Sequence, residues 1–179
     1  MRAGASGILV FLMLVPSIGL ASPLCDRYER AIQALSGDSQ GKVVPVMSRP
    51  SGAQDKSPPR EVGCQIEGTP FNRAVMLGFM KPELGGANHA LAAKNIYINA
   101  GVKTAPKPEP TLGAEAFSLL TNVTNLASPT PNSLVVIGHR ESIAVQLALQ
   151  KGYQSKIDIA ETDLDLARAL VRRVLDDVR

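Results

Sequence analysis

Tryptophan is absent from the 179-residue chain, and aromatic residues account for only 4% of it. So few aromatic rings argue against a platform on which sugars or nucleobases stack. A charge excess of one sign is also missing, because 19 lysines and arginines stand against 16 aspartates and glutamates and leave a formal net charge of +3. We therefore expect neither a nucleic-acid-binding protein nor one held at an anionic membrane surface.

Apolar runs long enough to cross a bilayer, roughly 20 residues, are missing as well. A shorter apolar run, residues 8–15, follows Arg2 near the N-terminus, and small residues at positions 19 and 21, three and one before the cleavage point, precede Ser22. A positive start, a short apolar centre and a small-residue cleavage site are typical of a secretory signal peptide. The pattern predicts that residues 1–21 are removed on export to the periplasm or the extracellular space, with no stable membrane anchor after cleavage.

Cysteine and histidine are scarce, with two of each. In an exported chain an even pair of cysteines is typical of a structural bond, so we expect a Cys25–Cys64 disulfide. The chain-entropy treatment of cross-links assigns such a bond about 3–4 kcal/mol of stability. A redox-active pair or a metal site is less favoured, because there is no C-x-x-C and only His89 and His139 could complete a ligand set. We expect no metal and no cofactor.

Residues 22–179, which follow the leader, suffice for one domain with its own core. Residues 24–35 repeat apolar side chains every three to four positions, which predicts a helix ending at residues 36–38. Prolines and polar residues predict an exposed loop at 49–60, and an alanine-rich stretch predicts a middle helix at 85–99. Strand patterns occur at 42–47, where Pro45 marks an edge, at 62–67, and at 74–80, which is apolar on both faces.

The C-terminal third of the chain decides the fold class. Residues 134–137 are apolar and β-branched, and side chains alternate over 143–150, which predicts a β-hairpin that turns at 138–141. From Thr162, its expected cap, the apolar spacing predicts a final helix to the C-terminus. Residues 113–120 are compatible with a strand or with a helical turn. The order predicts an α+β fold, in which a mostly antiparallel sheet packs against an N-terminal, a middle and a C-terminal helix.

Several landmarks follow one another along the mature chain. A cysteine opens the first predicted helix, a second lies on an early strand, and a Leu-Gly-x-x-Ala-Phe element, a hairpin and a C-terminal helix follow; they are Cys25, Cys64, 112–117, 134–149 and 164–178. This order resembles small exported bacterial domains of unknown function, notably some actinobacterial lipoproteins. The chain departs from them because no lipobox precedes its first cysteine, and glutamine and isoleucine stand where a tryptophan is expected after the second. The resemblance implies the α+β fold and no particular activity.

The predicted hairpin turn invites an enzymatic interpretation. A strand followed by glycine and His139 resembles the nucleophile turn of α/β-hydrolases, but Arg140 occupies the nucleophile position and the next segment alternates like a strand. A small hydrolase would combine His139 with Ser142 or Glu141 and an acid such as Asp158. The favoured alternative is a polar hairpin tip that exposes a histidine and a charge pair.

Three residues are candidates for binding, namely His89, His139 and Arg140. His89 lies near the start of the predicted middle helix, where backbone amides can hold an anion, although a solvated first turn is the favoured interpretation. On the last helix Asp165 is spaced for a helical ion pair with Arg168 or Arg172 on a solvated face.

Because no catalytic set converges in the sequence, enzymatic activity is not favoured. We expect a non-enzymatic protein of the cell envelope that binds an envelope protein or component through a sheet face or through the 49–60 loop. One alternative is the small hydrolase built around His139. Another is a small-ligand carrier, whose pocket would be lined by Met76, Phe79, Ile96 and Leu147.

Overall fold

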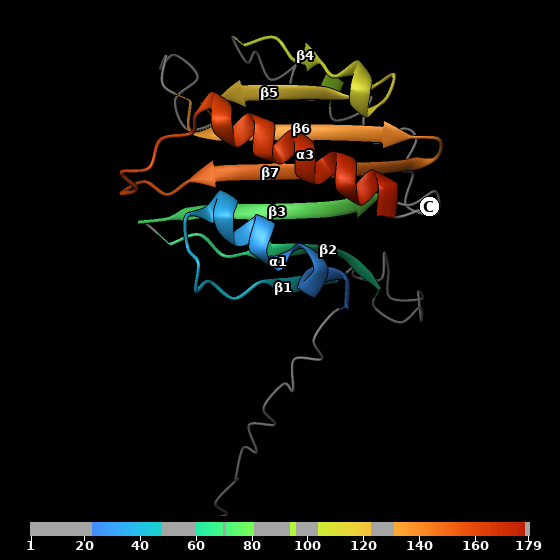
Figure 1. Cartoon of the computed structure of the whole chain (residues 1–179). Helices are drawn as coiled ribbons and strands as arrows, with labels where there is room; N and C mark the ends of the chain where they lie inside the picture. Colours follow the sequence, from blue (N-terminus) through green and yellow to red (C-terminus); the bar gives the residue numbers. More distant parts are fainter. Residues whose placement is uncertain are drawn as a thin grey trace, which may run out of the picture.

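In the part of the chain that the structure describes, a seven-stranded antiparallel sheet carries the helices α1 and α3 on one face (Figure 1). The computed structural model describes residues 23–47, 60–69, 71–80, 94–95, 104–122 and 131–177. In chain order the elements are α1 (Pro23–Ser36), β1 (Val44–Met47), β2 (Glu61–Ile66), β3 (Arg73–Met80), β4 (Lys107–Pro108), the 3-10 helix η2 (Pro110–Leu112), β5 (Phe117–Thr121), β6 (Ser133–Arg140), β7 (Ile143–Lys151) and α3 (Glu161–Asp177). Across the sheet the strands follow the order β1-β2-β3-β7-β6-β5-β4. The predicted α+β class and antiparallel sheet are confirmed.

The two helices divide the sheet between them. α1 lies over β2 and β3, and α3 lies over β6 and β7 (Figure 1). Beneath them the inward side chains of these four strands form the main core, and they include Leu77, Val136 and Leu147. The predicted middle helix at 85–99 falls outside the described residues except for Lys94 and Asn95, so a third helix packed on the sheet stays a prediction.

The N-terminal helix forms where its apolar spacing predicts it. Tyr28, Ile32 and Leu35 follow one another at spacings of three to four and are fully or almost fully buried. The helix ends as predicted, because Gly37 adopts a φ of 74° and its N–H donates to the Gln33 carbonyl at 3.1 Å. Glycine adopts this left-handed conformation without the steric cost that a side chain adds.

The predicted β-hairpin is present as β6 and β7, but its turn lies further along the chain. Gly138, His139 and Arg140 all pair with β7, and Glu141 and Ser142 make the turn. A turn at Gly138 is therefore wrong. The glycine serves close packing instead, because a Cβ there would lie 2.5 Å from a methyl of Val171 and 2.7 Å from one of Leu175 on α3.

Prolines lie on both outermost described strands of the sheet. Pro45 lies on β1, as the edge prediction required, and Pro108 lies on β4. A register shift between Val46 and Met47 further disrupts the β1 ladder. Proline has no N–H to donate, and bulged or very short edge strands pair poorly with another chain. The open question about 113–120 is answered by β5, which brings 117–121 into the sheet.

A buried ion pair joins the start of β3 to the start of α3. Arg73 and Asp163 are only 6% and 7% exposed, and Nη1 of the arginine donates to Oδ1 of the aspartate at 2.7 Å. The second oxygen, Oδ2, accepts from the Ala160 N–H at 2.8 Å. The helix begins at Glu161, which places Thr162 inside it, so the predicted Thr162 cap is wrong. The side chain that bonds to the backbone just before the helix is that of Asp163.

Two side chains tie the N-terminus of α1 to the C-terminus of α3. The Tyr28 hydroxyl donates to Oδ2 of Asp177 at 3.0 Å, and the guanidinium of Arg173 lies 5.7 Å from the centre of the tyrosine ring. The pKa of Tyr28 is raised from 10.0 to about 12. Burial of the hydroxyl is the largest cause, and the hydrogen bond to Asp177 is the second.

Removal of the charge on Asp163 should be strongly destabilising. The Asp163→Asn substitution keeps an oxygen for the Ala160 N–H but removes the carboxylate charge that the buried guanidinium of Arg73 hydrogen-bonds, which costs about 3 kcal/mol of unfolding free energy. Urea denaturation measures the loss. Asp158→Asn, at the exposed pair that Asp158 forms with Lys151, is the control and should change little. Equal effects of the two substitutions would contradict the inferred role of Asp163.

The Tyr28 pKa predicts a specific loss of stability at alkaline pH. Because the folded pKa lies above the unfolded value, the stabilisation is complete below pH 10 and is lost as the pH rises toward 12. Between pH 10 and pH 12 the unfolding free energy of Tyr28→Phe should fall by about 2 kcal/mol less than that of the wild type. Tyr153→Phe, at a tyrosine that is 83% exposed, should follow the wild-type curve. Superimposable curves for wild type and Tyr28→Phe would refute the prediction.

Candidate functional site

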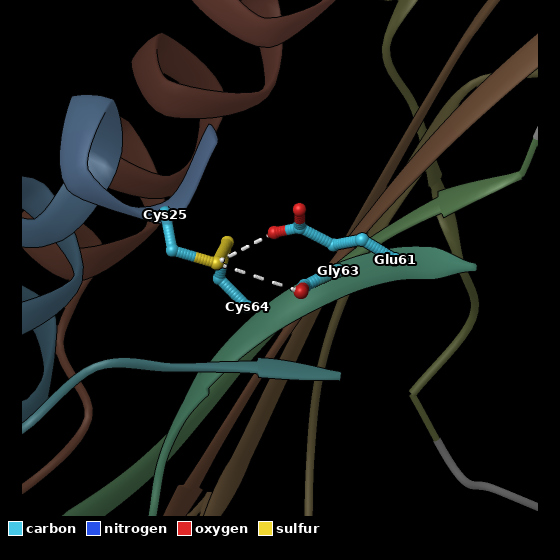
Figure 2. Close-up of a disulfide and its surroundings, with 4 residues drawn as sticks. All are labelled: Cys25, Glu61, Gly63 and Cys64. Atoms are coloured by element: carbon cyan, nitrogen blue, oxygen red, sulfur yellow. Dashed lines mark hydrogen bonds between the residues drawn. A yellow bond between two sulfur atoms is a disulfide. The ribbon is translucent and has the colours of Figure 1, made fainter. Parts of the chain in front are cut away.

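The two cysteines meet as predicted, where the first turn of α1 lies over β2. The sulfurs of Cys25 and Cys64 are 2.05 Å apart and their Cα atoms 5.5 Å apart, so the predicted disulfide is confirmed. Figure 2 shows two oxygens beside the Cys25 sulfur, Oε1 of Glu61 at 3.1 Å and the Gly63 carbonyl at 3.6 Å. A disulfide sulfur carries no proton, so these are oxygen–sulfur contacts, which become hydrogen bonds only when Cys25 is a thiol. The two sulfurs and the Glu61 carboxylate lie close enough to share a metal ion, but the oxidised pair offers no thiolate ligand.

The candidate residues of the hairpin are not exposed at its tip. His139 lies on β6 opposite Ala144 and is partly buried, and its Nε2 is buried without a hydrogen-bond partner. Arg140 instead binds the C-terminal end of α3, where its Nη1 donates to the Leu175 carbonyl at 3.1 Å and to Oδ1 of Asp176 at 2.7 Å. A cation near the last carbonyls of a helix complements its dipole, so Arg140 has a structural role.

The acid named in the hydrolase hypothesis lies far from His139. The proposed acid Asp158 forms an ion pair with Lys151, at the end of β7 remote from the turn. That hydrogen bond lowers the pKa of Asp158 below its ordinary value. His139 pairs with Ala144 near the opposite end of the same strand. At about 3.3 Å per residue the two ends lie roughly 20 Å apart, well beyond the reach of a catalytic triad.

The remaining predicted sites are separated or lie outside the described residues. His89 lies outside them, as do residues 49–59 of the predicted loop. The three described residues of the expected carrier pocket do not line one cavity, because Phe79 and Leu147 are buried in the core beneath the helices while Met76 is 40% exposed and points to the opposite face. Ile96 is not described.

A groove crosses the sheet face that is turned away from α1 and α3, which we call the distal face. It has a volume of about 630 Å³. Its lining includes one cross-strand row in register, with one residue each from β2, β3, β7 and β6: Gln65, Met76, Ala148 and Val135. A second row contributes Ala74, Gln150 and Ser133. The centre of this cross-strand groove is therefore apolar, and hydrogen-bonding side chains flank it.

The groove continues into a neighbouring hollow near the β2–β3 turn. This hollow of about 390 Å³ shares Gly68, Ala74 and Gln150 with the groove and is walled by Tyr153. Phe71 lies in the turn before β3 and is 70% exposed. Its neighbour Asn72 accepts at its carbonyl from the Gly152 N–H at 2.9 Å, next to Tyr153 in the chain. Two of the few aromatic side chains are thus presented to solvent at one end of the sheet, a concentration that composition alone does not reveal.

A third cavity, of about 260 Å³, lies on the helix side of the sheet between β4, β5 and the first turn of α3. We call it the α3 pocket. Its described lining comprises Thr104, Ala105, Lys107, Ser118, Leu120, Thr121, Asn122, Pro131, Glu161 and Leu164.

The wall of the α3 pocket is held by an ion-pair network that the sequence did not suggest. Oε1 of the buried Glu109 accepts from the Ser118 hydroxyl at 2.6 Å and from Nε and Nη2 of Arg168 at 2.8 and 2.6 Å. The hydrogen bond to Glu109 is the largest cause that raises the pKa of Arg168 above its ordinary value. The predicted pair of Arg168 with Asp165 is present at 3.0 Å, but Arg168 is not simply part of a solvated face, because it holds the connector before β5 against α3.

Comparison with protein-family models, with curated proteins and with solved structures finds no match for the chain. Within the described residues no helix is both long and apolar enough to cross a membrane.

Proposed function

We propose that the chain is an exported, disulfide-bonded binding domain of the cell envelope, which binds an extended segment of a partner protein in the cross-strand groove. The groove on the distal face is the observation that carries this proposal. The sequence of residues 1–21 supports export. A bonded cysteine pair is compatible with an oxidising compartment.

The dimensions of the groove favour a short extended peptide. From Gln65 on β2 to Val135 on β6 it crosses three interstrand spacings, which at about 4.8 Å each span about 14 Å. A fully extended chain covers that distance in about four residues. The prolines at both described edges make binding by strand addition unfavourable, so a partner that meets this sheet is directed to a face.

The chemistry of the lining specifies which peptide fits. Met76, at the centre, is a flexible and polarisable side chain that adapts to an apolar anchor. Gln65 and Gln150 carry amide groups that can donate to and accept from a peptide backbone. Glu67 is the one charged residue among the described lining. We therefore propose a segment in which an aliphatic or aromatic anchor is followed by a basic residue.

Export and the disulfide can be tested in one mass measurement. Protein expressed in its own host and recovered from the exported fraction should begin at Ser22. Its intact mass should equal that of residues 22–179 less two hydrogens for the disulfide. Treatment with a thiol reductant under denaturing conditions should restore those two hydrogens. Recovery of residues 1–21 on the mature protein would contradict the proposed cleavage, and an unchanged mass on reduction would contradict the disulfide.

Peptide binding can be tested by selection from a random peptide library on the mature protein. Selected peptides should carry an apolar anchor beside lysine or arginine, and Met76→Lys should weaken their binding about tenfold or more, because it places a charge in the apolar centre. Met47→Lys is the matched control, since Met47 is 48% exposed on β1 and does not line the groove.

Thermal unfolding of both variants checks that each remains folded. Peptides that bind Met76→Lys as tightly as the wild type would place the binding site elsewhere. A library that yields no binder, while soluble envelope glycans bind in a Met76-dependent manner, would replace the peptide by a glycan.

A further inference from the structure

The α3 pocket has the size and polarity of a small-molecule site, and its position is independent of the cross-strand groove. At about 260 Å³ it is slightly smaller than most ligand pockets, which run from roughly 300 to 1,000 Å³. Such a volume suits a ligand of few heavy atoms rather than a nucleotide or an oligosaccharide. Leu120 and Leu164 supply apolar surface, and Leu164 is almost completely buried.

The pocket presents one positive and one negative side chain. Lys107 stands opposite Ser118 in the β4–β5 ladder, so both project toward the face that carries α3. Glu161 lies in the first turn of α3, one helical turn before Leu164. Both charged residues are exposed.

These two charges are unusual for their surroundings, because neighbouring charges are paired. Glu109 is bound by Arg168, and Asp163 by Arg73. By contrast, no ion pair or side-chain hydrogen bond within the described part of the chain engages the amine of Lys107 or the carboxylate of Glu161. Acid in the first turn of a helix also complements its dipole, which is the purely structural role of Glu161.

We propose that the α3 pocket binds a small zwitterion, an α-amino acid or a dipeptide with an apolar side chain. Lys107 receives the ligand carboxylate, Glu161 receives its ammonium group, and Leu120 and Leu164 contact the apolar side chain. Thr104 and Asn122 also line the pocket and add further polar residues to it. Charge-assisted hydrogen bonds at both ends make recognition depend on both ligand charges.

The proposal can be tested by calorimetric titration of the mature protein with leucine and with the dipeptide Ala-Ala, together with leucinamide, which lacks the carboxylate, and N-acetylleucine, which lacks the ammonium. Leucine or Ala-Ala should bind. Whichever binds more tightly shows whether the pocket prefers a single amino acid or a dipeptide. The amidated and the N-acetylated form of the better ligand, made for Ala-Ala as for leucine, should each bind about tenfold more weakly, because one charge-assisted contact is lost.

Two charge-removing substitutions assign each contact. Lys107→Gln should abolish the preference for the free over the amidated carboxylate, while the preference for the free over the acetylated amine remains. Glu161→Gln should do the reverse. Lys156→Gln and Glu29→Gln remove equivalent charges from exposed or partly exposed positions outside the pocket lining and should retain both preferences.

The ligand preferences of the variants distinguish a role of Glu161 in ligand binding from a purely structural role. If Glu161 acts only on the helix dipole, Glu161→Gln will lower the unfolding temperature and leave ligand preferences unchanged, which overturns the proposal. Absence of binding by every member of the panel to the wild type also overturns it. Neither result affects the proposed peptide groove, because the groove lies on the opposite face and is tested through Met76.

Discussion

The buried ion pair between Arg73 and Asp163 determines how the rest of the molecule is arranged. It joins the first residue of an interior strand to the first turn of the long C-terminal helix across ninety residues of sequence. Charges are removed from water at high cost, so the pair is tolerated only where both partners are held in place. It therefore sets where α3 begins, and Gly138 allows the helix to lie close to β6 further along. At the other end Arg140 binds the last turn of α3.

With α3 held in this way, and α1 held by the disulfide and by Tyr28, the helices are committed to one face of the sheet. The inward residues of β3, β7 and β6 are then buried as a continuous apolar core. On the distal face burial is uneven. A second cluster at β5 and β6, containing Phe117 and Ile137, is fully buried, whereas Met76 on β3 is 40% exposed. The cross-strand groove lies at this transition, where the sheet retains apolar side chains that the described helices do not cover.

Local patterns in the sequence locate most of the described elements and the covalent bond. Periodicity located α1, β6 and β7, and the compartment suggested by residues 1–21 led to the Cys25–Cys64 pairing. The hairpin turn was misplaced because glycine is a common turn residue, and only the approach of Val171 and Leu175 shows that Gly138 is needed inside a strand. Thr162 was a reasonable cap by residue type, but the helix begins one residue earlier and Asp163 is drawn inward by Arg73.

The candidate sites themselves could not be predicted, because their residues meet only through the sheet order. Glu109 and Arg168 are separated by 59 residues and their pairing has no local signature. The row formed by Gln65, Met76 and Ala148 requires the β2-β3-β7 order, which no pattern in the chain specifies. Met76 and Phe79 both belong to an apolar strand, and the predicted carrier pocket failed because an offset of three residues places them on opposite faces.

The Arg73–Asp163 ion pair adjoins lining residues of both candidate sites. It therefore bears on whether binding at one site affects binding at the other. Arg73 precedes Ala74 and Val75, which line the groove, and Asp163 precedes Leu164, which lines the α3 pocket. Coupling between sites requires an element with two arrangements whose equilibrium both ligands bias. A buried pair whose aspartate also accepts from the backbone at the helix N-terminus favours this one arrangement, because its rupture leaves an uncompensated charge in the core. The structure therefore favours a rigid frame between the two surfaces, on which a peptide and a small zwitterion would bind independently.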